Sequence, residues 1–191
     1  MRATGVALAA ILAGATSARA AVPPITVEFS EAAVANGTNL VGSNAFAAEG
    51  LHFTGSATYI LDPALIGAGT DNAGITTGLN PNFMGVTFDG GATSVTFAGV
   101  TLNTEFVATA FDSSNNVLDT FSAPSVPGLN YLTHTFSGVG DIARVEFHDN
   151  AQFIAVGRIE YTVVPEPTML GTLGAILGLP LLAARQRRGR R

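Results

Sequence analysis

The stretch VTFDGGATSVTF, residues 86–97, carries the pattern that decides the fold. On each side of Asp89-Gly90-Gly91, a valine and a phenylalanine alternate with a threonine. Alternation of apolar and polar residues at a period of two is typical of a β-strand with one buried face. An Asp-Gly pair supplies the positive φ angles that a tight turn needs. The stretch therefore predicts a β-hairpin.

Similar alternation recurs upstream and downstream, and no sustained helical stripe interrupts it. Many short strands separated by turns predict an all-β domain, a two-sheet β-sandwich that is jelly-roll-like. Residues 62–82 form a long interruption rich in Gly and Pro, which is expected to be a functional or loosely ordered loop. The other segments predicted as strands are 25–30, 50–61, 104–111, 117–122, 130–136, 142–148 and 153–163.

The last two of these segments predict which side chains face the core. Val145 and Phe147 share one face of the first segment, and Ile159 belongs to the inner face of the second. Arg144 and Arg158 then lie on outer faces. Each arginine is expected to pair with a neighbouring acid, in a contact worth no more than about 1 kcal/mol.

The N-terminus has the three parts of a secretory signal peptide. A positive charge at Arg2 precedes an apolar run over residues 6–15, and small residues follow at Ala18 and Ala20. This pattern predicts a signal peptide over residues 1–20, with cleavage after Ala20. The run is too short to be a stable membrane anchor.

The last 28 residues predict membrane insertion. Residues 168–184 are apolar and, as a helix, would span about 25 Å against a hydrocarbon core of about 30 Å. Charged residues are costly inside a bilayer, so the basic tail over 185–191 is expected to stay cytoplasmic and everything before the helix to lie outside. The predicted stop-transfer residues are Arg185, Arg187, Arg188, Arg190 and Arg191.

Val164, Pro165, Glu166 and Pro167 precede this apolar run. The two prolines fix φ and favour extended backbone before them, which leaves the segment open to a processing enzyme. The motif, apolar helix and arginine cluster together resemble the PEP-CTERM sorting signal of Gram-negative bacteria that make exopolysaccharide. The resemblance implies sorting and cleavage near the motif by a membrane-embedded exosortase. The alternative is a proline-containing linker before an ordinary tail anchor.

The exported domain over residues 21–163 is strongly acidic. Residues 21–164 contain 13 acidic residues against two arginines, a net charge of about −11, and the whole chain has no lysine. Nucleic-acid partners require phosphate-neutralising bases and are therefore excluded. Cysteine is absent, which excludes disulfides and thiol chemistry. Tryptophan is also absent, so only Tyr59, Tyr131 and Tyr161 could stack on a sugar.

No residue pattern in the chain is typical of an enzyme. His52, His134 and His148 lie far apart, without the spacing of a zinc site. No GxSxG nucleophile motif is present. His134 has the same strand parity as Leu132 and Phe136, so it is expected to be a hydrogen-bonded histidine of the core or its rim. The sequence therefore predicts a non-catalytic protein with no catalytic residues.

Calcium is the one cofactor with some support. Asp112, Asn115, Asn116 and Asp119 surround one turn, and Asp71 with Asn72 lies in the long interruption. Their side chains offer the oxygen ligands that Ca²⁺ prefers. Asp and Asn are equally what an ordinary β-turn contains, because they bond to the local backbone. The prediction is no bound metal, with a calcium site as the alternative.

Residues 108–118, a strand followed by an Asp, Ser and Asn turn, resemble the galactose-binding-like jelly rolls that occur in PEP-CTERM proteins. The resemblance implies a β-sandwich. Those domains often carry an acidic pair in the last strand, where this chain has Gly157 and Arg158. A cation or ligand site of the family type at that position is therefore not expected.

These features predict a non-catalytic surface or extracellular-matrix protein. It would be exported, held in the inner membrane by residues 164–191, processed by an exosortase-like enzyme, and located finally at the cell surface or outside the cell, where exopolysaccharide is a candidate partner. The alternative is a glycan-binding module, with or without calcium, supported by the long interruption and by the three tyrosines Tyr59, Tyr131 and Tyr161.

Overall fold

The computed structural model describes residues 22–29, 34–61, 73–77, 83–102, 105–124, 128–149 and 154–165. These residues form nine β-strands and one 3-10 turn, η2, over Ala47–Glu49. The strands are β1 (Ile25–Glu28), β2 (Leu51–Gly55), β3 (Thr58–Leu61), β4 (Ala73–Thr76), β5 (Met84–Leu102), β6 (Phe106–Phe111), β7 (Val117–Ala123), β8 (Leu129–Asp149) and β9 (Ile154–Val163).

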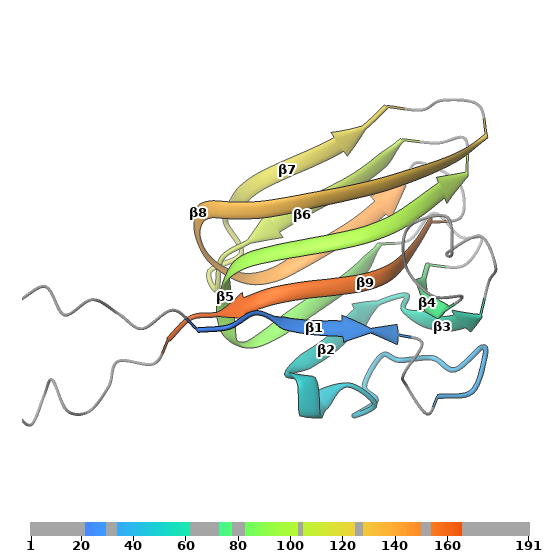
Figure 1. The fold of residues 1–191 in the computed structure, drawn as a ribbon, viewed down its shortest axis with the longest axis horizontal. Helices are drawn as coiled ribbons and strands as arrows, with labels where there is room; N and C mark the ends of the chain where they lie inside the picture. Colours follow the sequence, from blue (N-terminus) through green and yellow to red (C-terminus); the bar gives the residue numbers. More distant parts are fainter. Residues whose placement is uncertain are drawn as a thin grey trace, which may run out of the picture.

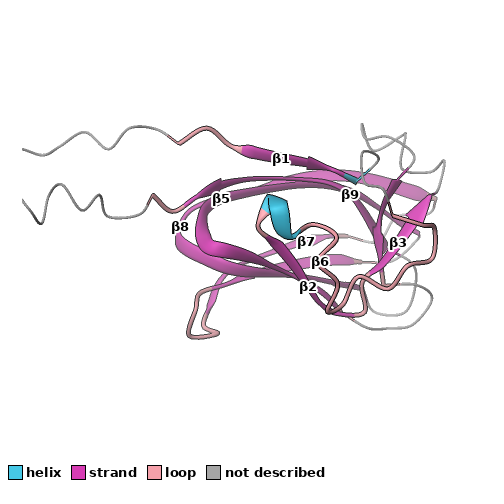
Figure 2. Ribbon diagram, turned by 90° about the horizontal axis from the view of Figure 1, so that it is seen from below, coloured by secondary structure: helices cyan, strands magenta, loops and turns pink. Residues whose placement is uncertain are grey.

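All nine strands belong to one antiparallel hydrogen-bonded sheet that folds into two layers (Figures 1 and 2). The β9 layer contains β1, β3, β4 and β9, with residues 92–102 of β5 and 129–137 of β8. The β6 layer contains β2, β6 and β7, with residues 84–88 of β5 and 144–149 of β8. The predicted all-β sandwich is confirmed.

The predicted hairpin at Asp89-Gly90-Gly91 is wrong, because β5 continues through this segment. Thr87 pairs with Arg144 and Ala92 with Ile142, so residues 88–91 bulge out of the ladder with β8. Gly90 and Gly91 have φ angles of +72° and +77°. The expected positive φ angles are present, but they bend one strand between layers, as a bulge does. The arms separate because each finds partners in a different layer.

The two strands predicted over 130–136 and 142–148 are likewise one strand, β8. Its corner lies beside that of β5, where the register shifts between the pairs Ala92–Ile142 and Ser94–Ser137. Gly138 and Gly140 have positive φ angles there. Glycine adopts such angles without the steric cost that other residues incur. The two long strands therefore turn together from one layer into the other.

Two further predictions need correction. Residues 62–82 were expected to form one loop, yet they include β4, which pairs with β3 and β9. Its residues are all buried, and strands flank it on both edges. The predicted strand over 50–61 is divided into β2 and β3 at Gly55, whose φ is +74°. A Cβ at Gly55 would lie 2.3 Å from the carbonyl oxygen of Phe83.

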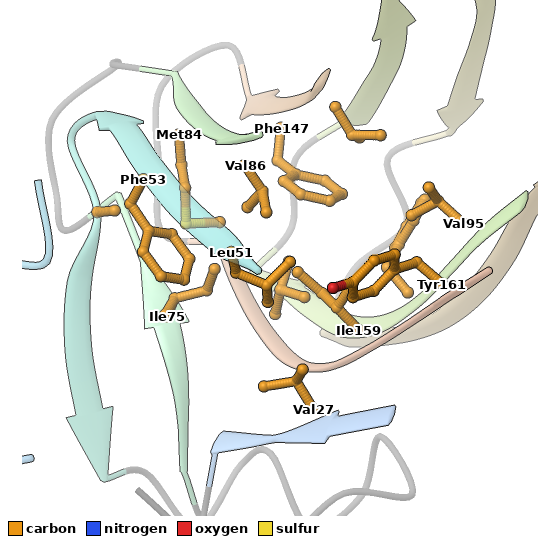
Figure 3. Close-up of a cluster of buried hydrophobic side chains, with 14 of the residues drawn as sticks. Val27, Leu51, Phe53, Ile75, Met84, Val86, Val95, Phe147, Ile159 and Tyr161 are labelled. Carbon is orange, nitrogen blue, oxygen red and sulfur yellow. The ribbon is translucent and has the colours of Figure 1, made fainter. Parts of the chain in front are cut away.

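The core lies between the two layers, as Figure 3 shows for part of it. Phe97 of the β9 layer contacts Phe106 and Phe147 of the β6 layer, at ring-centroid distances of 5.7 and 5.0 Å. Burying a phenylalanine side chain stabilises a fold by about 1.5 to 3 kcal/mol. The side chains labelled in Figure 3 are Val27, Leu51, Phe53, Ile75, Met84, Val86, Val95, Phe147, Ile159 and Tyr161.

The predicted inner and outer faces of the last two strands are confirmed. Val145, Phe147 and Ile159 are fully buried. Arg144 lies 3.1 Å from Glu146 on one outer face, and Arg158 lies 3.8 Å from Glu28 on the other. Both ion pairs are partly exposed, so each contributes little to stability.

Replacing Gly90 by alanine tests whether the β5 corner depends on backbone conformation alone. No atom lies within 4 Å of the position of a Cβ there, so the substitution adds strain without a clash. We expect Gly90→Ala to lower the free energy of unfolding by about 1 to 2 kcal/mol. Gly90→Asn should cost less, because asparagine tolerates this conformation. Urea unfolding measures both, and equal stability of the alanine variant and the wild type would contradict the assignment.

Candidate functional site

Only one of the three tyrosines is accessible to a ligand. Tyr59 and Tyr161 are 2% and 1% exposed, whereas Tyr131 is 48% exposed. The hydroxyl of Tyr59 donates to the carbonyl oxygen of Phe29 at 3.0 Å, and burial raises the pKa of Tyr59. The hydroxyl of Tyr161 donates to the carbonyl oxygen of Glu49. Tyr59 therefore holds the core together, and its expected role in sugar stacking is wrong.

Tyr131 lies on the outer side of the β9 layer. It pairs with Val100 of β5 in register, and the side chains of alternate residues point outward along β8. Val100 and Ala155, which share its row across the sheet, are buried, and the next rows contain residues of β8, β5, β9 and β1. We call this surface the Tyr131 face. Its residues are Tyr131, Thr133 and Thr135 of β8, Thr96 of β5, Arg158 and Glu160 of β9, and Thr26 and Glu28 of β1.

The Tyr131 face combines an aromatic ring with many hydrogen-bonding groups. The hydroxyls of Thr96 and Thr135 lie 2.8 Å apart, and the Arg158–Glu28 pair is about one-third exposed. Such a surface offers a stacking ring beside donors and acceptors. These are the groups that a polyhydroxylated ligand would use.

In the candidate calcium site, Asp112 and Asn116 bond to each other within the turn. Asp112 Oδ1 accepts hydrogen bonds from the backbone N–H groups of Ser114 and Asn116, and Oδ2 accepts one from the Asn116 amide, all at 2.8 Å. Asp119 Oδ1 instead accepts from the N–H of Thr120. These bonds, led by that of the Asn116 side chain, lower the pKa of Asp112. The carboxylate of Asp112 thus stabilises the turn through local hydrogen bonds.

The three histidines occupy three different environments. His52 Nε2 lies 3.1 Å from Asp89 on the surface, and His148 lies half-buried opposite Val107. His134 points into the space between the layers, as its parity predicted. Its Nε2 is buried and has no hydrogen-bond partner among the described residues, so the expected hydrogen bond is missing. Within those residues, no group of three or more His, Asp or Glu side chains is arranged to hold a metal ion.

The predicted sorting motif begins where the domain ends. β9 stops at Val163, and the N–H of Val164 donates to the carbonyl oxygen of Gly91 at 3.1 Å. Pro165 is the last residue described. The other predicted signal residues lie outside the described ranges: Ala18, Ala20, Glu166, Pro167, Arg185, Arg187, Arg188, Arg190 and Arg191. Asp71 and Asn72 lie outside them too.

The described residues contain no helix of sufficient length and apolarity to cross a membrane.

Both ends of the domain leave it at one pole, which we call the exit pole. β1 is antiparallel to β9, and Ile25 pairs with Tyr161 near the end of β9. Figure 1 shows the start of β1 beside the end of β9. The bond from Val164 to Gly91 also places the corner of β5 at this pole. The described part of the chain therefore begins and ends at the same pole.

No protein-family model and no curated protein matches this chain. Among solved structures, the K2 cleaved adhesin domain of Lys-gingipain is similar in fold, with 10% sequence identity and a TM-score of 0.51. The match covers 74% of this chain and 98% of that domain. A family 29 carbohydrate-binding module complexed with cellulohexaose is more distant, with 14% identity, a TM-score of 0.42, and coverage of 76% and 99%. The likeness to the adhesin domain is one of fold.

The parity of β8 could have distinguished Tyr131 from Tyr59 in the sequence. Leu132, His134 and Phe136 share the inner face, so Tyr131 necessarily lies on the outer one. No comparable signal existed for Tyr59, because its strand has four residues and the apolar Ile60 and Leu61 that follow Tyr59 break the alternation. Burial of Tyr59 results from contacts with segments distant in the sequence, such as Phe29.

Replacing Asp112 by alanine tests whether this turn binds calcium. We expect the melting temperature to fall by the same amount in EDTA and in excess calcium, because the lost bonds are internal. Asp112→Asn should retain part of them. Since the folded pKa lies below the usual 3.8, the stabilisation is present above that pH and disappears as the pH falls through the folded pKa. Calcium-dependent stabilisation of the wild type alone would contradict this interpretation.

Proposed function

We propose that this protein is a non-catalytic exported protein of the cell surface or extracellular matrix. Residues 164–191 would sort it, and an exosortase-like enzyme would cut near Pro165, Glu166 and Pro167. The supporting observation is the position of the motif directly after β9, which ends at Val163, with the N–H of Val164 still bonded to the carbonyl oxygen of Gly91. The membrane segment and the folded domain are thus separated only by the motif.

The exit pole gives this arrangement a defined orientation. The domain starts and ends at one pole, so both terminal signals would connect to the membrane from the same side. Before processing, the exit pole would face the bilayer. The Tyr131 face lies along the side of the sandwich and would remain accessible from outside the cell. Cleavage at the motif would then release a complete domain, because the cut falls after β9.

Mass spectrometry of the mature C-terminus tests the sorting proposal. In a strain with the processing enzyme, we expect the protein to end near residues 164–167 and to lack the arginine tail. In a strain without that enzyme, the tail should persist in the membrane fraction. Replacing Pro165 and Pro167 by alanine should slow cleavage and leave the fold intact. An intact tail in both strains would contradict sorting by this route.

A second candidate function is glycan binding, and the exposed Tyr131 favours it. Neutral polysaccharides present alternating apolar faces and hydroxyl edges, which suit an aromatic ring beside threonine hydroxyls and an ion pair. Thr135, Thr96 and Arg158 lie on the same face as the ring. Exopolysaccharide of the producing cell is the natural ligand to try first.

Affinity electrophoresis in gels that contain a neutral polysaccharide tests glycan binding. We expect Tyr131→Ala to weaken retardation by about tenfold or less, because one aromatic contact is worth about 0.5 to 1.5 kcal/mol. Tyr131→Phe retains the ring and should bind nearly as wild type. Phe83→Ala removes another exposed aromatic, 44% accessible, and is the matched control. Equal retardation of all four proteins would rule out the Tyr131 face, and repetition in EDTA would reveal any role of calcium.

A further inference from the structure

One long side of the sandwich is closed by side chains rather than by paired strands. β7 is the last strand of the β6 layer, and residues 129–137 of β8 pair with β5. β7 and this part of β8 meet across the layers. Leu118 approaches Gly140 so closely that its Cδ2 lies 3.6 Å from where a Cβ would be. Phe121 stacks on His134 further along. We call this contact line the β7 seam.

His134 is the titratable group inside the β7 seam. Its ring is stacked on Phe121 at a centroid distance of 4.1 Å and an interplanar angle of 16°. Phe136 meets it edge-on at 4.8 Å, and Phe97 lies at 5.9 Å. The Nε2 atom is cut off from water and has no hydrogen-bond partner in the described part of the chain. An uncharged ring suits this apolar setting.

One charge faces His134 from the strands that pack on it. β5 contributes Phe97, β8 contributes Phe136, and β7 contributes Phe121 and the carboxylate of Asp119. Burial lowers the pKa of His134, and Asp119 raises it by a smaller amount, so that the pKa lies below the usual 6.5. A buried histidine with a lowered pKa destabilises the packed seam when it takes up a proton. The destabilisation grows as the pH falls from 6.5 towards the lower pKa.

We propose that His134 makes the β7 seam acid-labile, so that its protonation loosens β7 from the β9 layer while the ladder between β5 and β8 stays closed. A charged imidazolium needs a partner for both N–H groups, and Nε2 has none inside the seam. Its attraction to the face of Phe121 offsets only part of the lost hydration. β7 can yield because an edge strand opens at lower cost than a central one.

Hydrogen exchange of the full-length protein, followed by mass spectrometry from about pH 7.5 to about pH 5, tests this proposal. Protection of β7 amides, corrected for intrinsic exchange, should start to fall near pH 6.5 and should level off below the midpoint of the NMR titration of His134. Linkage fixes the size of the effect. Protection should fall by about tenfold in total for each unit by which the pKa of His134 in the closed seam lies below its pKa when β7 is detached. Amides of β5 should keep their protection over the same range.

Two variants separate the charge of His134 from its packing. His134→Phe keeps an aromatic ring and removes the titration, so the protection of β7 should become independent of pH. Asp119→Asn removes the charge that raises the pKa, so the midpoint should move to lower pH. His52→Gln and His148→Gln remove the other two imidazoles, which lie outside the β7 seam, and should behave as wild type. Constant β7 protection while His134 titrates, or an unchanged acid response in His134→Phe, would overturn the proposal.

Discussion

The pairing of β5 with β8 through both layers is the constraint on which the rest of the structure depends. Neither strand ends at the corner, so the same ladder fixes the position of each layer relative to the other. Every remaining strand is connected to one of these two directly or through one or two intervening strands. With no cysteine to cross-link the layers, the continuous backbone of β5 and β8 holds them in register. The phenylalanine contacts between the layers then fill the space that this ladder defines.

The sequence predicts the strands and their faces well, because both depend on local alternation. Val145, Phe147 and Ile159 face the core as their spacing indicates. The corners of β5 and β8, which local patterns predict as breaks between strands, lie within continuous strands for a physical reason. Gly90-Gly91 supplies the same positive φ angles to a hairpin and to a bulge, and the outcome depends on which strand covers each arm. That information is in the distant residues 144–147 and 130–142, which local patterns do not address.

The candidate site could be predicted only in part. The type of residue, an aromatic ring on an acidic and lysine-free domain, was evident, but three tyrosines competed for the role. Accessibility decides between them, and accessibility is a property of tertiary packing. Tyr59 and Tyr161 both donate to backbone carbonyls of distant segments, Phe29 and Glu49, which tie the chain before β2 to the layers. Two side chains that were candidates for ligand binding therefore stabilise the fold instead.

The two long sides of the sandwich are closed by different means, and this difference explains why a charge matters on one of them. On the side of β2, Phe29, Phe46 and Phe53 pack together at centroid distances of 5.1 to 6.3 Å. Tyr161 adds a hydrogen bond there. On the side of β7, the ring of His134 packs among Phe97, Phe121 and Phe136, in a position that a phenylalanine side chain could also fill. An apolar closure is insensitive to pH, whereas one that includes an imidazole is stable only while the ring is uncharged.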